Sequence, residues 1–224
     1  MGYYPMFVEL EGRRCLVIGG GAEAQRKVEG LRAAGGDVMI ISPKLTRDLQ
    51  RMLAEGEIDH HQRDYQEGDL EGYEICMVAT DDGEVNAEVS AEGKRRRVWV
   101  NAADDTKNCD FILPSVIRRG LITLAASTGG ASPALARRLR EELEAYLTEE
   151  MPALADLLGE VRTDLRSRGI APGPEVWQEA IDEDLRVLLA QRKHRQAKAR
   201  LLGALGAGDL VEELVGAGSG RDQA

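Results

Sequence analysis

The stretch Arg13–Lys27, RRCLVIGGGAEAQRK, decides the fold. Its apolar run, Cys15–Ile18, predicts a short buried strand, and three glycines follow that strand at once. From Ala24 onward, apolar residues recur at helical spacing until Gly35 and Gly36 end the pattern. A buried strand that passes through glycines directly into a helix is typical of parallel sheets that bind nucleotides.

The same alternation continues along the next eighty residues. Four further runs predict strands: DVMIISP, IDHHQRDY, YEICMVATDD and VWVNAAD. Two segments between them predict helices: LTRDLQRMLAEG and GEVNAEVSAEGKRRR. Strands that alternate with helices over short loops predict a doubly wound parallel sheet. We therefore expect an α/β, Rossmann-like domain over residues 1–113.

The pattern changes after Ile112. The runs FILPSVIRRG and LITLAASTGG predict two paired strands, and a helix with an apolar stripe begins at Ser132. We expect a small α+β region over residues 114–147 and a helical domain over residues 148–206. The last residues, GAGSGRDQA, are small and polar, and we expect a disordered tail over residues 207–224.

Composition excludes several classes of function. The 224 residues carry a net charge of -10, which argues against nucleic acid or an anionic membrane as partner. Three widely spaced cysteines predict neither a disulfide framework nor a zinc site. We see no signal segment and no apolar run of about 18 residues, so we expect a cytoplasmic protein.

The glycines fit the pattern G-x-G-x-x-A from Gly19 to Ala24, between a strand and a helix. In that pattern the first glycine allows a tight turn, the second lets the backbone approach a pyrophosphate, and the alanine lets the helix pack closely. An ordinary glycine turn is the alternative. The expected cofactor contacts in this loop are Gly19, Gly21, Ala22 and Glu23.

Two further strand ends belong to the same predicted edge. The second strand ends in IISPK, without the acidic residue that usually holds a ribose, so Ser42 or the backbone would do this. Lys44 leaves a 2′-phosphate possible, but we favour NAD over NADP. The expected contacts to the adenosine ribose are Ser42, Pro43 and Lys44. Thr80 and Asp81, in ATDD, are expected near the cofactor, although a helix cap is the alternative.

Acids gather after the last predicted strand of this domain, in VNAADDTKNCDFILPS. Asp104, Asp105 and Asp110 are there together with Cys109. These residues form either a turn or a place where protons are accepted. His60 and His61 have no third ligand at a suitable spacing, so we predict no metal site.

Four segments together resemble the precorrin-2 dehydrogenase/sirohydrochlorin ferrochelatase family, which is the amino-terminal half of bacterial siroheme synthase and also occurs as a free-standing protein. The segments are YPMFVELEGRRCLVIGGGAEAQRK, ATDDGEVN, VNAADDTKNCDFILPS and ASTGGASPALARRLREELE. They occur in order over roughly Tyr4–Leu147. The helical remainder matches more loosely.

The resemblance implies the chemistry. Family members oxidise precorrin-2, a tetrapyrrole with eight carboxylates, to sirohydrochlorin with NAD+, and many then insert Fe2+ to give siroheme. The family's acidic residue, three after the Asn of VN, corresponds to Asp104 and is implicated in both steps. The family also implies a homodimer formed through residues 114–147. Candidate contacts to the substrate are Asn101, Ser127, Thr128, Arg118 and Arg137.

Two alternatives stay open. A family member can keep only the dehydrogenase activity, and no metal-ligand motif decides this. A regulatory module that senses NAD without chemistry would keep the glycine loop, but it has no need of the acidic block after Asn101.

Overall fold

The structure is a computed structural model of the chain, and it describes residues 2–102 and 105–216. The chain divides into two compact units. The first comprises Met1–Leu113 with Gly129–Ala131, and the second comprises Pro114–Thr128 with Ser132–Ala224. Within the described residues, every helix is too short or too polar to span a lipid bilayer.

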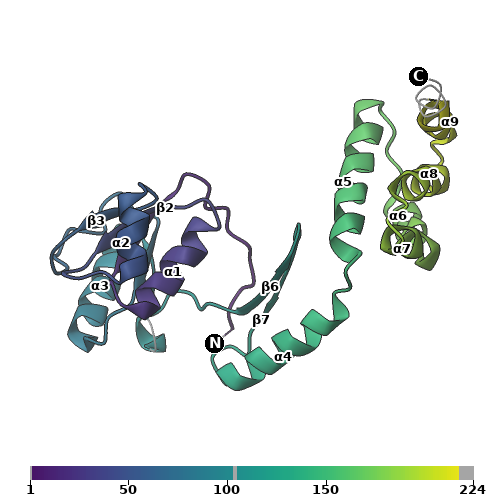
Figure 1. Cartoon of the computed structure of the whole chain (residues 1–224). Helices are drawn as coiled ribbons and strands as arrows, with labels where there is room; N and C mark the ends of the chain where they lie inside the picture. Colours follow the sequence, from purple (N-terminus) through teal and green to yellow (C-terminus); the bar gives the residue numbers. More distant parts are fainter. Residues whose placement is uncertain (1, 103–104, 217–224) are drawn as a thin grey trace. The chain divides into compact units, whose positions relative to one another are not determined.

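A five-stranded parallel sheet forms the centre of the first unit, as the sequence predicts (Figure 1). Across the sheet the strands are β3 (Asp59–His61), β2 (Asp37–Ile41), β1 (Arg14–Ile18), β4 (Ile75–Val78) and β5 (Trp99–Ala102). In the centre, Val17 of β1 lies between Ile40 of β2 and Met77 of β4. The strand order changes direction between β1 and β4, which is where sheets of this kind bind ligands.

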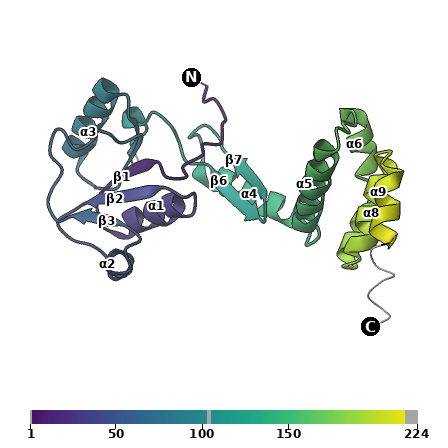
Figure 2. The ribbon, with the colours of Figure 1, turned by 90° about the horizontal axis from the view of Figure 1, so that it is seen from above.

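Helices cover both faces of this sheet (Figure 2). The helices α1 (Ala22–Arg32) and α2 (Arg47–Ala54) lie on one face, and α3 (Gly83–Arg96) lies on the other. A short 3-10 turn, η1 (Thr106–Asn108), follows β5. Thr46 caps α2 and Asp82 caps α3, each by accepting hydrogen bonds from first-turn amides.

Alternation along the strands produces two apolar cores. Val17 packs with Val28 of α1 on one face, and both are fully buried. The neighbouring residue, Leu16, packs with Val89 of α3 on the other face, also without exposure. A strand buried on both faces reads as a continuous apolar run, which is why the sequence identifies β1 and β4 so clearly.

Glu92 of α3 is a carboxylate without exposed surface. It accepts hydrogen bonds from Tyr65 Oη at 2.6 Å, Gly68 N at 3.1 Å and Leu70 N at 3.2 Å. Arg96 Nε lies 2.6 Å from Glu92 Oε1 and forms an ion pair with it. Burial by itself raises the pKa of Glu92, but one hydroxyl, two backbone amides and a guanidinium outweigh it, so the pKa lies below its ordinary value.

We expect Glu92→Ala to lower the free energy of unfolding by about 3 kcal/mol, because removing one partner of a buried ion pair leaves the others unpaired. Since folding lowers the pKa of Glu92, its stabilisation is complete above the ordinary carboxyl pKa and is lost as the pH falls through the folded value. Urea unfolding measures this at neutral and acidic pH. The difference in unfolding free energy between wild type and Glu92→Ala should become smaller in acid. Glu88→Ala, an exposed change one turn earlier, should have little effect; an equal loss there would contradict this reading.

The second unit begins with an antiparallel hairpin of β6 (Ser115–Arg119) and β7 (Ile122–Ala126). The helix α4 (Pro133–Tyr146) packs on both strands, and Ser132 caps it through the Leu135 amide. As far as residue 216, where the described part of the chain ends, five helices follow: α5 (Met151–Ser167), α6 (Pro174–Ala180), α7 (Glu183–Ala190), α8 (His194–Ala204) and α9 (Gly208–Gly216). Leucines of α5, α7 and α8, such as Leu165, Leu185 and Leu201, form their core.

The end of the helical domain differs from the sequence-based expectation of a tail over residues 207–224. The structure places α9 within that range and buries Ala207 and Leu210 against the helical core. The apolar residues Leu210 and Val211 are a short signal for a helix, and the glycines around them favoured the prediction of a tail instead. Residues 217–224 lie outside the described residues.

Candidate active site

The carboxyl ends of β1 and β4 meet at the point where the strand order changes direction. Gly19 N donates to Ile41 O of β2 at 2.9 Å, and Ala79 N donates to Ile18 O of β1 at 2.8 Å. These bonds hold the glycine loop and the start of the ATDD segment at one edge of the sheet. The edge therefore brings together two of the segments that the sequence singled out.

Two of the three glycines are required by packing. Gly19 has φ +112°, and a Cβ there would lie 2.3 Å from Ala79 O. A Cβ on Gly20 would lie 2.0 Å from Lys44 O, because Thr46 N donates to Gly20 O and draws the two loops together. Any larger side chain at either position would have to displace backbone.

Gly21 is different, because neither packing nor conformation requires a glycine there. It has extended backbone angles, and no heavy atom of the described residues lies within 4 Å of a Cβ built on it. It is the N-cap of α1, and no described side chain accepts from the first-turn amides, in contrast to the capped helices α2 and α3. A helix N-terminus with unfilled space beside it suits a phosphate group.

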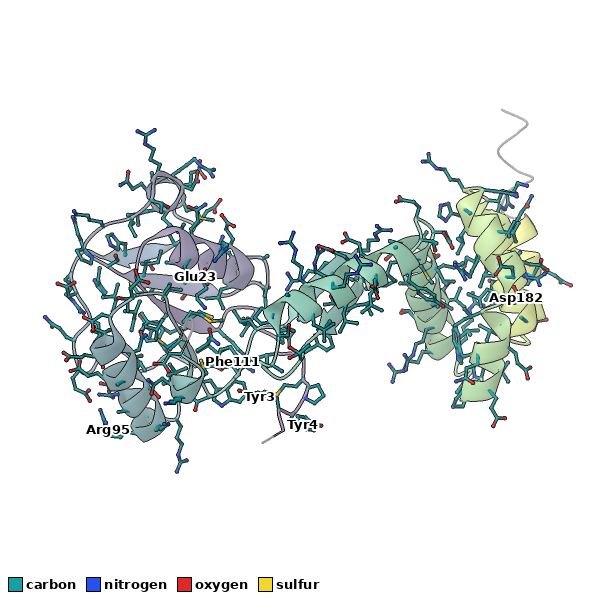
Figure 3. The ribbon with its side chains drawn as sticks, turned by 90° about the horizontal axis from the view of Figure 1, so that it is seen from below. Tyr3, Tyr4, Glu23, Arg95, Phe111 and Asp182 are labelled. Atoms are coloured by element: carbon teal, nitrogen blue, oxygen red, sulfur yellow. The ribbon has the colours of Figure 1, made fainter. Side chains whose placement is uncertain are left out.

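Glu23 introduces an acid into this first turn, which would oppose a bound anion. Figure 3 labels Glu23 on α1. Its carboxylate forms ion pairs with Arg26 of the next turn and with Lys27 Nζ, the latter at 3.8 Å. These cations offset the charge of Glu23. The backbone amides of Ala22 and Glu23 are therefore the groups that suit a pyrophosphate, and the loop fits a dinucleotide such as NAD.

The end of β2 gives Ser42 a role that the sequence did not suggest. Ser42 is buried, and its hydroxyl donates to Lys44 O at 2.7 Å. His60 belongs to the neighbouring strand, β3, and its Nε2 lies 2.8 Å from Ser42 O. Ser42 therefore shapes the loop from inside, whereas Pro43 and Lys44 are exposed at its surface.

The end of β4 carries Thr80 and Asp81. Thr80 Oγ1 accepts from Asp82 N at 3.2 Å, and Asp82 in turn accepts from Glu84 N at 2.9 Å. The helix cap considered for ATDD is thus present, and Asp82 provides it. Asp81 is exposed beside the cap and does not provide it.

The end of β5 holds a buried polar cluster that sequence reasoning missed in part. Asn101 is 7% exposed, and its Oδ1 accepts from Lys27 Nζ at 2.9 Å. Its Nδ2 donates to Phe111 O at 2.9 Å. Lys27 belongs to α1 and is also 7% exposed, so a cation of this helix reaches under the end of β5. One sequence signal could have identified Lys27 as buried: its position falls on the same inward face of the predicted helix as Ala24, Val28 and Leu31.

The other residues of the acidic block fasten its loop. Asp110 Oδ2 accepts from Val100 N at 2.9 Å, and Asp110 N donates to Val100 O at 2.8 Å. Cys109 Sγ lies 3.2 Å from Ala102 N and 3.1 Å from Ala102 O, and burial is the main cause that raises the pKa of this thiol. Asp105 Oδ2 accepts from Asn108 Nδ2 at 2.7 Å. Asp110, Cys109 and Asp105 therefore act as turn residues.

Asp104, the predicted catalytic residue, lies outside the described residues. Its neighbours in sequence are described on either side, at Ala102 and Asp105. They place the ends of this segment directly after β5, at the same carboxyl edge of the sheet as Asn101.

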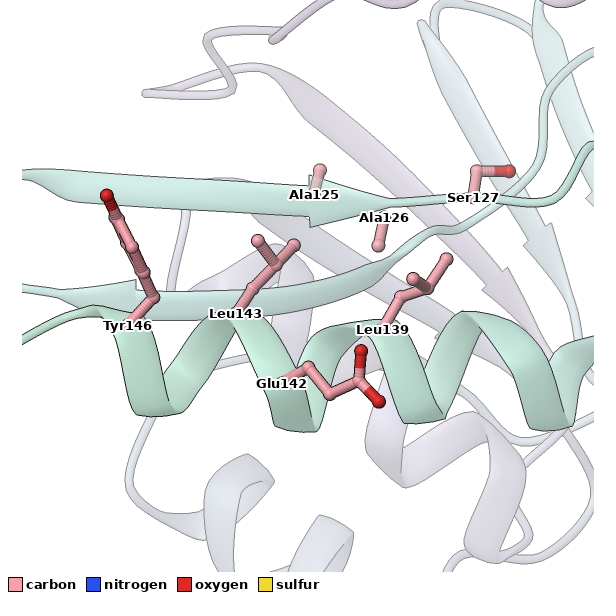
Figure 4. Close-up of a pocket in the computed structure, with 7 residues that line it drawn as sticks. All are labelled: Ala125, Ala126, Ser127, Leu139, Glu142, Leu143 and Tyr146. Atoms are coloured by element: carbon pink, nitrogen blue, oxygen red, sulfur yellow. The ribbon is translucent and has the colours of Figure 1, made fainter.

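The remaining candidate contacts belong to the second unit, and their roles stay predictions. Thr128 Oγ1 accepts from Ser132 N at 3.0 Å, which closes the turn before α4. Arg137 pairs with Glu141 on an exposed helix face, and Arg118 is exposed on β6. Ser127 lines a shallow groove between β7 and α4 (Figure 4). The other residues of that groove are Ala125, Ala126, Leu139, Glu142, Leu143 and Tyr146.

In the part of the chain that the structure describes, no three side chains of His, Cys, Asp or Glu come together as a metal site would require. His60 instead contacts the Ser42 carbonyl through Nε2, and His61 is exposed.

Comparisons with known proteins agree with the geometry of both units. Residues 6–115 match a family described as putative NAD(P)-binding, and residues 119–146 match the sirohaem biosynthesis protein central family. The siroheme synthase of Photorhabdus laumondii is 37% identical over 224 residues, covering 98% of this chain and 48% of that protein. That of Methylobacillus flagellatus is 40% identical over 164 residues, covering 73% and 35%. The chain thus spans about half the length of the first of these relatives and about a third of the second.

A solved structure is similar over most of both chains. It is titled SirC, precorrin-2 dehydrogenase, and it superposes with a TM-score of 0.69 at 28% sequence identity. The match covers 87% of this chain and 98% of that one.

Proposed function

The chain belongs to the precorrin-2 dehydrogenase/sirohydrochlorin ferrochelatase family, and from this premise we propose that it oxidises precorrin-2 to sirohydrochlorin with NAD+. The observation that carries the proposal is the N-terminus of α1. There, Gly21 leaves space that neither packing nor backbone conformation explains, beside first-turn amides that no described side chain caps. The two family matches and the similar dehydrogenase structure support the same assignment.

Different residues at the carboxyl edge of the sheet would bind different parts of NAD+. The amides of Ala22 and Glu23 hold the pyrophosphate, with Gly19 and Gly21 allowing its approach. Pro43 and Lys44 lie at the adenosine ribose, and Thr80 with Asp81 flank the other half of the cofactor. When bound, NAD+ would supply the acceptor for a hydride, with its two electrons, from a carbon of precorrin-2, and a proton would then have to leave the oxidised ring.

Asp104 is the residue that we propose accepts this proton. In the sequence it follows β5 by two residues, and of the described residues on either side of it, Ala102 ends that strand and Asp105 follows the strand's carboxyl end. A carboxylate at this position suits a general base, because oxidation of the ring system releases protons together with the hydride. The other acids of the same block have structural partners, such as Val100 for Asp110 and Asn108 for Asp105.

The substrate would bring eight carboxylates to a chain with a net charge of -10. Repulsion at long range would oppose this approach unless local cations line the path. Arg118 and Arg137 of the second unit are the residues that we propose for this purpose. Asn101, Ser127 and Thr128 would add hydrogen bonds to the carboxylates or to the ring.

We also propose that the protein inserts Fe2+ into sirohydrochlorin, with the metal as a substrate. Metal insertion displaces two pyrrole protons, so the same carboxylate, Asp104, would serve this step as well. A dehydrogenase without this second activity is the alternative. An experiment can distinguish these two possibilities, because only an enzyme with the second activity accelerates the conversion of sirohydrochlorin to siroheme when Fe2+ is added.

The experiment is an anaerobic incubation of the purified protein with precorrin-2 and NAD+, followed by absorption spectroscopy. The expected result is the spectrum of sirohydrochlorin, formed only when NAD+ is present. An unchanged precorrin-2 spectrum, together with tight binding of NAD+, would instead identify a regulatory module. Addition of Fe2+ after completion then tests the second step.

We propose further that the protein is a homodimer formed through residues 114–147. Apolar side chains of α4 are exposed in this chain, among them Leu135 at 51% and Tyr146 at 76%, and Leu121 at the hairpin turn is 73% exposed. Exposure of several large apolar residues on one small region is typical of an interface. The occupant that the family relationship favours is the same region of a second copy.

Sedimentation at micromolar concentration is expected to give a dimer. Leu139→Asp, on the apolar stripe of α4, should shift the protein to monomer, because an unpaired carboxylate would be buried in the interface. Glu141→Ala, a change on the polar side of the same helix, should leave the dimer intact. A wild-type monomer, or a Leu139→Asp protein that remains dimeric, would contradict the proposed interface.

A further inference from the structure

Asn86 of α3 is a buried amide that the proposed reaction has not yet used. It is 5% exposed, and its side-chain oxygen, Oδ1, accepts no hydrogen bond from any described residue. A buried acceptor without a donor lowers stability, so proteins seldom keep one where an apolar side chain would fit. Arg32 Nε is the other such atom among the described residues, but it lies in the last turn of α1, at the opposite end of that helix from the glycine loop.

The position of Asn86 along α3 places it at the carboxyl edge of the sheet. Gly93, seven residues later, packs against β5, because a Cβ there would lie 2.3 Å from Val100 Cγ2. Seven residues make nearly two turns, so Asn86 is on the same face of α3, about 10.5 Å closer to its N-terminus. From Val100, β5 extends only about 6.6 Å further, to Ala102. Asn86 therefore lies just past the end of β5, and the contacts between α3 and η1 agree with this.

This edge of the sheet is the one expected to hold the nicotinamide half of a dinucleotide. In folds of this kind, the pyrophosphate lies at the N-terminus of the first helix and the adenosine ribose lies at the end of the second strand. The nicotinamide is therefore left to the side of β4 and β5, and α3 begins on that side, directly after β4.

The chemistry of Asn86 Oδ1 determines which ligand group suits it. An amide oxygen can only accept, so its partner must carry an N–H or O–H donor. The carboxylates of the proposed substrate are acceptors when ionised and cannot supply one. The nicotinamide ring carries a carboxamide, whose nitrogen is a donor.

We propose that Asn86 is a cofactor-binding residue whose Oδ1 accepts a hydrogen bond from the carboxamide nitrogen of nicotinamide. The proposal rests on the function proposed above. The last torsion of an asparagine side chain is broad, so the amide can turn its oxygen toward the edge of the sheet at small cost. The bond would fix the rotation of the nicotinamide ring, and thereby the face of the ring that meets the substrate.

The bland alternative is that Asn86 only supports the first turn of α3. That turn already has its cap, because Asp82 Oδ1 accepts from Glu84 N and Asp82 O accepts from Asn86 N. These bonds use the backbone of Asn86 and leave its side chain without a part in the cap. A purely supporting role would make any loss of binding the same for every dinucleotide.

The test is titration of wild type, Asn86→Leu and Asn86→Ala with NAD+ and with its acetylpyridine analogue. This analogue has a methyl group in place of the carboxamide –NH2 and keeps the charge and the rest of the molecule. We expect wild type to bind NAD+ more tightly than the analogue. The ratio of the analogue to the NAD+ dissociation constant should fall by on the order of tenfold in both variants, the usual effect of one lost hydrogen bond. Thermal unfolding should show that Asn86→Leu is at least as stable as wild type, because it removes an unpartnered acceptor.

Two controls isolate the effect. Asn86→Asp keeps an acceptor of the same shape and should keep the preference for NAD+, since any added charge acts equally on the two positively charged rings. Ser90→Ala changes a buried polar residue one turn further from the edge, and the ratio should stay at the wild-type value. A wild-type ratio in folded Asn86→Leu or Asn86→Ala would overturn the inference, even with weaker binding of both nucleotides. Failure of the wild-type protein to bind NAD+ would instead overturn the proposed function.

Discussion

Replacing Asp104 with alanine is expected to reduce the rate of precorrin-2 oxidation by about 10²–10⁴-fold, the usual contribution of a general base. The affinity for NAD+ should not change, because the proposed cofactor contacts come from α1 and from the ends of β2 and β4. Any activity in Fe2+ insertion should fall with it, since both steps would release protons to one carboxylate. Steady-state rates and a separate NAD+ titration measure the two quantities.

Asp105→Ala is the matched control for this change. Its described contact is a hydrogen bond from Asn108 within the same turn, so its loss should affect the rate only mildly. A healthy Asp104→Ala protein beside a dead Asp105→Ala protein would mean that the assignment of the base is displaced by one residue. If both variants stayed active, these acids would be turn residues without a catalytic role.

Gly21→Val is expected to abolish NAD+ binding in a protein that remains fully folded. No described heavy atom lies within 4 Å of a Cβ at this position, so a side chain can begin there without displacing backbone. Its branches would occupy the space beside the α1 amides, where the pyrophosphate is proposed to lie. We expect the affinity for NAD+ to fall by at least about 100-fold, which follows from losing the charge-assisted bonds to the helix N-terminus. Titration with NAD+ measures the affinity, and thermal unfolding measures the stability.

Gly19→Val supplies the opposite outcome two residues earlier. A Cβ there would lie 2.3 Å from Ala79 O, on a backbone with φ +112°, so this variant should lose stability outright. The pair therefore separates a glycine that the fold requires from one that a ligand requires. Unimpaired NAD+ binding in folded Gly21→Val would show that the free space at α1 has another purpose.

Local sequence patterns predicted most of the first unit. The continuous apolar runs of β1 and β4 are buried on both faces, and the glycines and caps mark where helices begin. These signals span only a few neighbouring residues, so they can be seen without knowledge of the fold. The cofactor role of Gly21 rests on the same kind of local pattern, a strand–glycine–helix sequence, and stays a prediction.

Contacts between distant residues could not be predicted. Lys27 and Asn101 are 74 positions apart, and only the packing of α1 against the sheet shows that they meet. The contact of Ser42 with a ribose stays a prediction, and the hydrogen bond that its hydroxyl donates to Lys44 O, although local, depends on a loop conformation that no sequence pattern indicates. The fastening of Asp110 to Val100 likewise depends on the return of the chain along β5.

The central claim is that NAD+ bound at the carboxyl edge of this sheet takes a hydride from precorrin-2. The most direct measurement records NADH fluorescence and sirohydrochlorin absorption together during one anaerobic reaction. The account predicts that NADH and sirohydrochlorin appear at the same rate and in equal amounts, and that Gly21→Val forms neither. Sirohydrochlorin produced without NADH, or NAD+ bound without any change in precorrin-2, would contradict it.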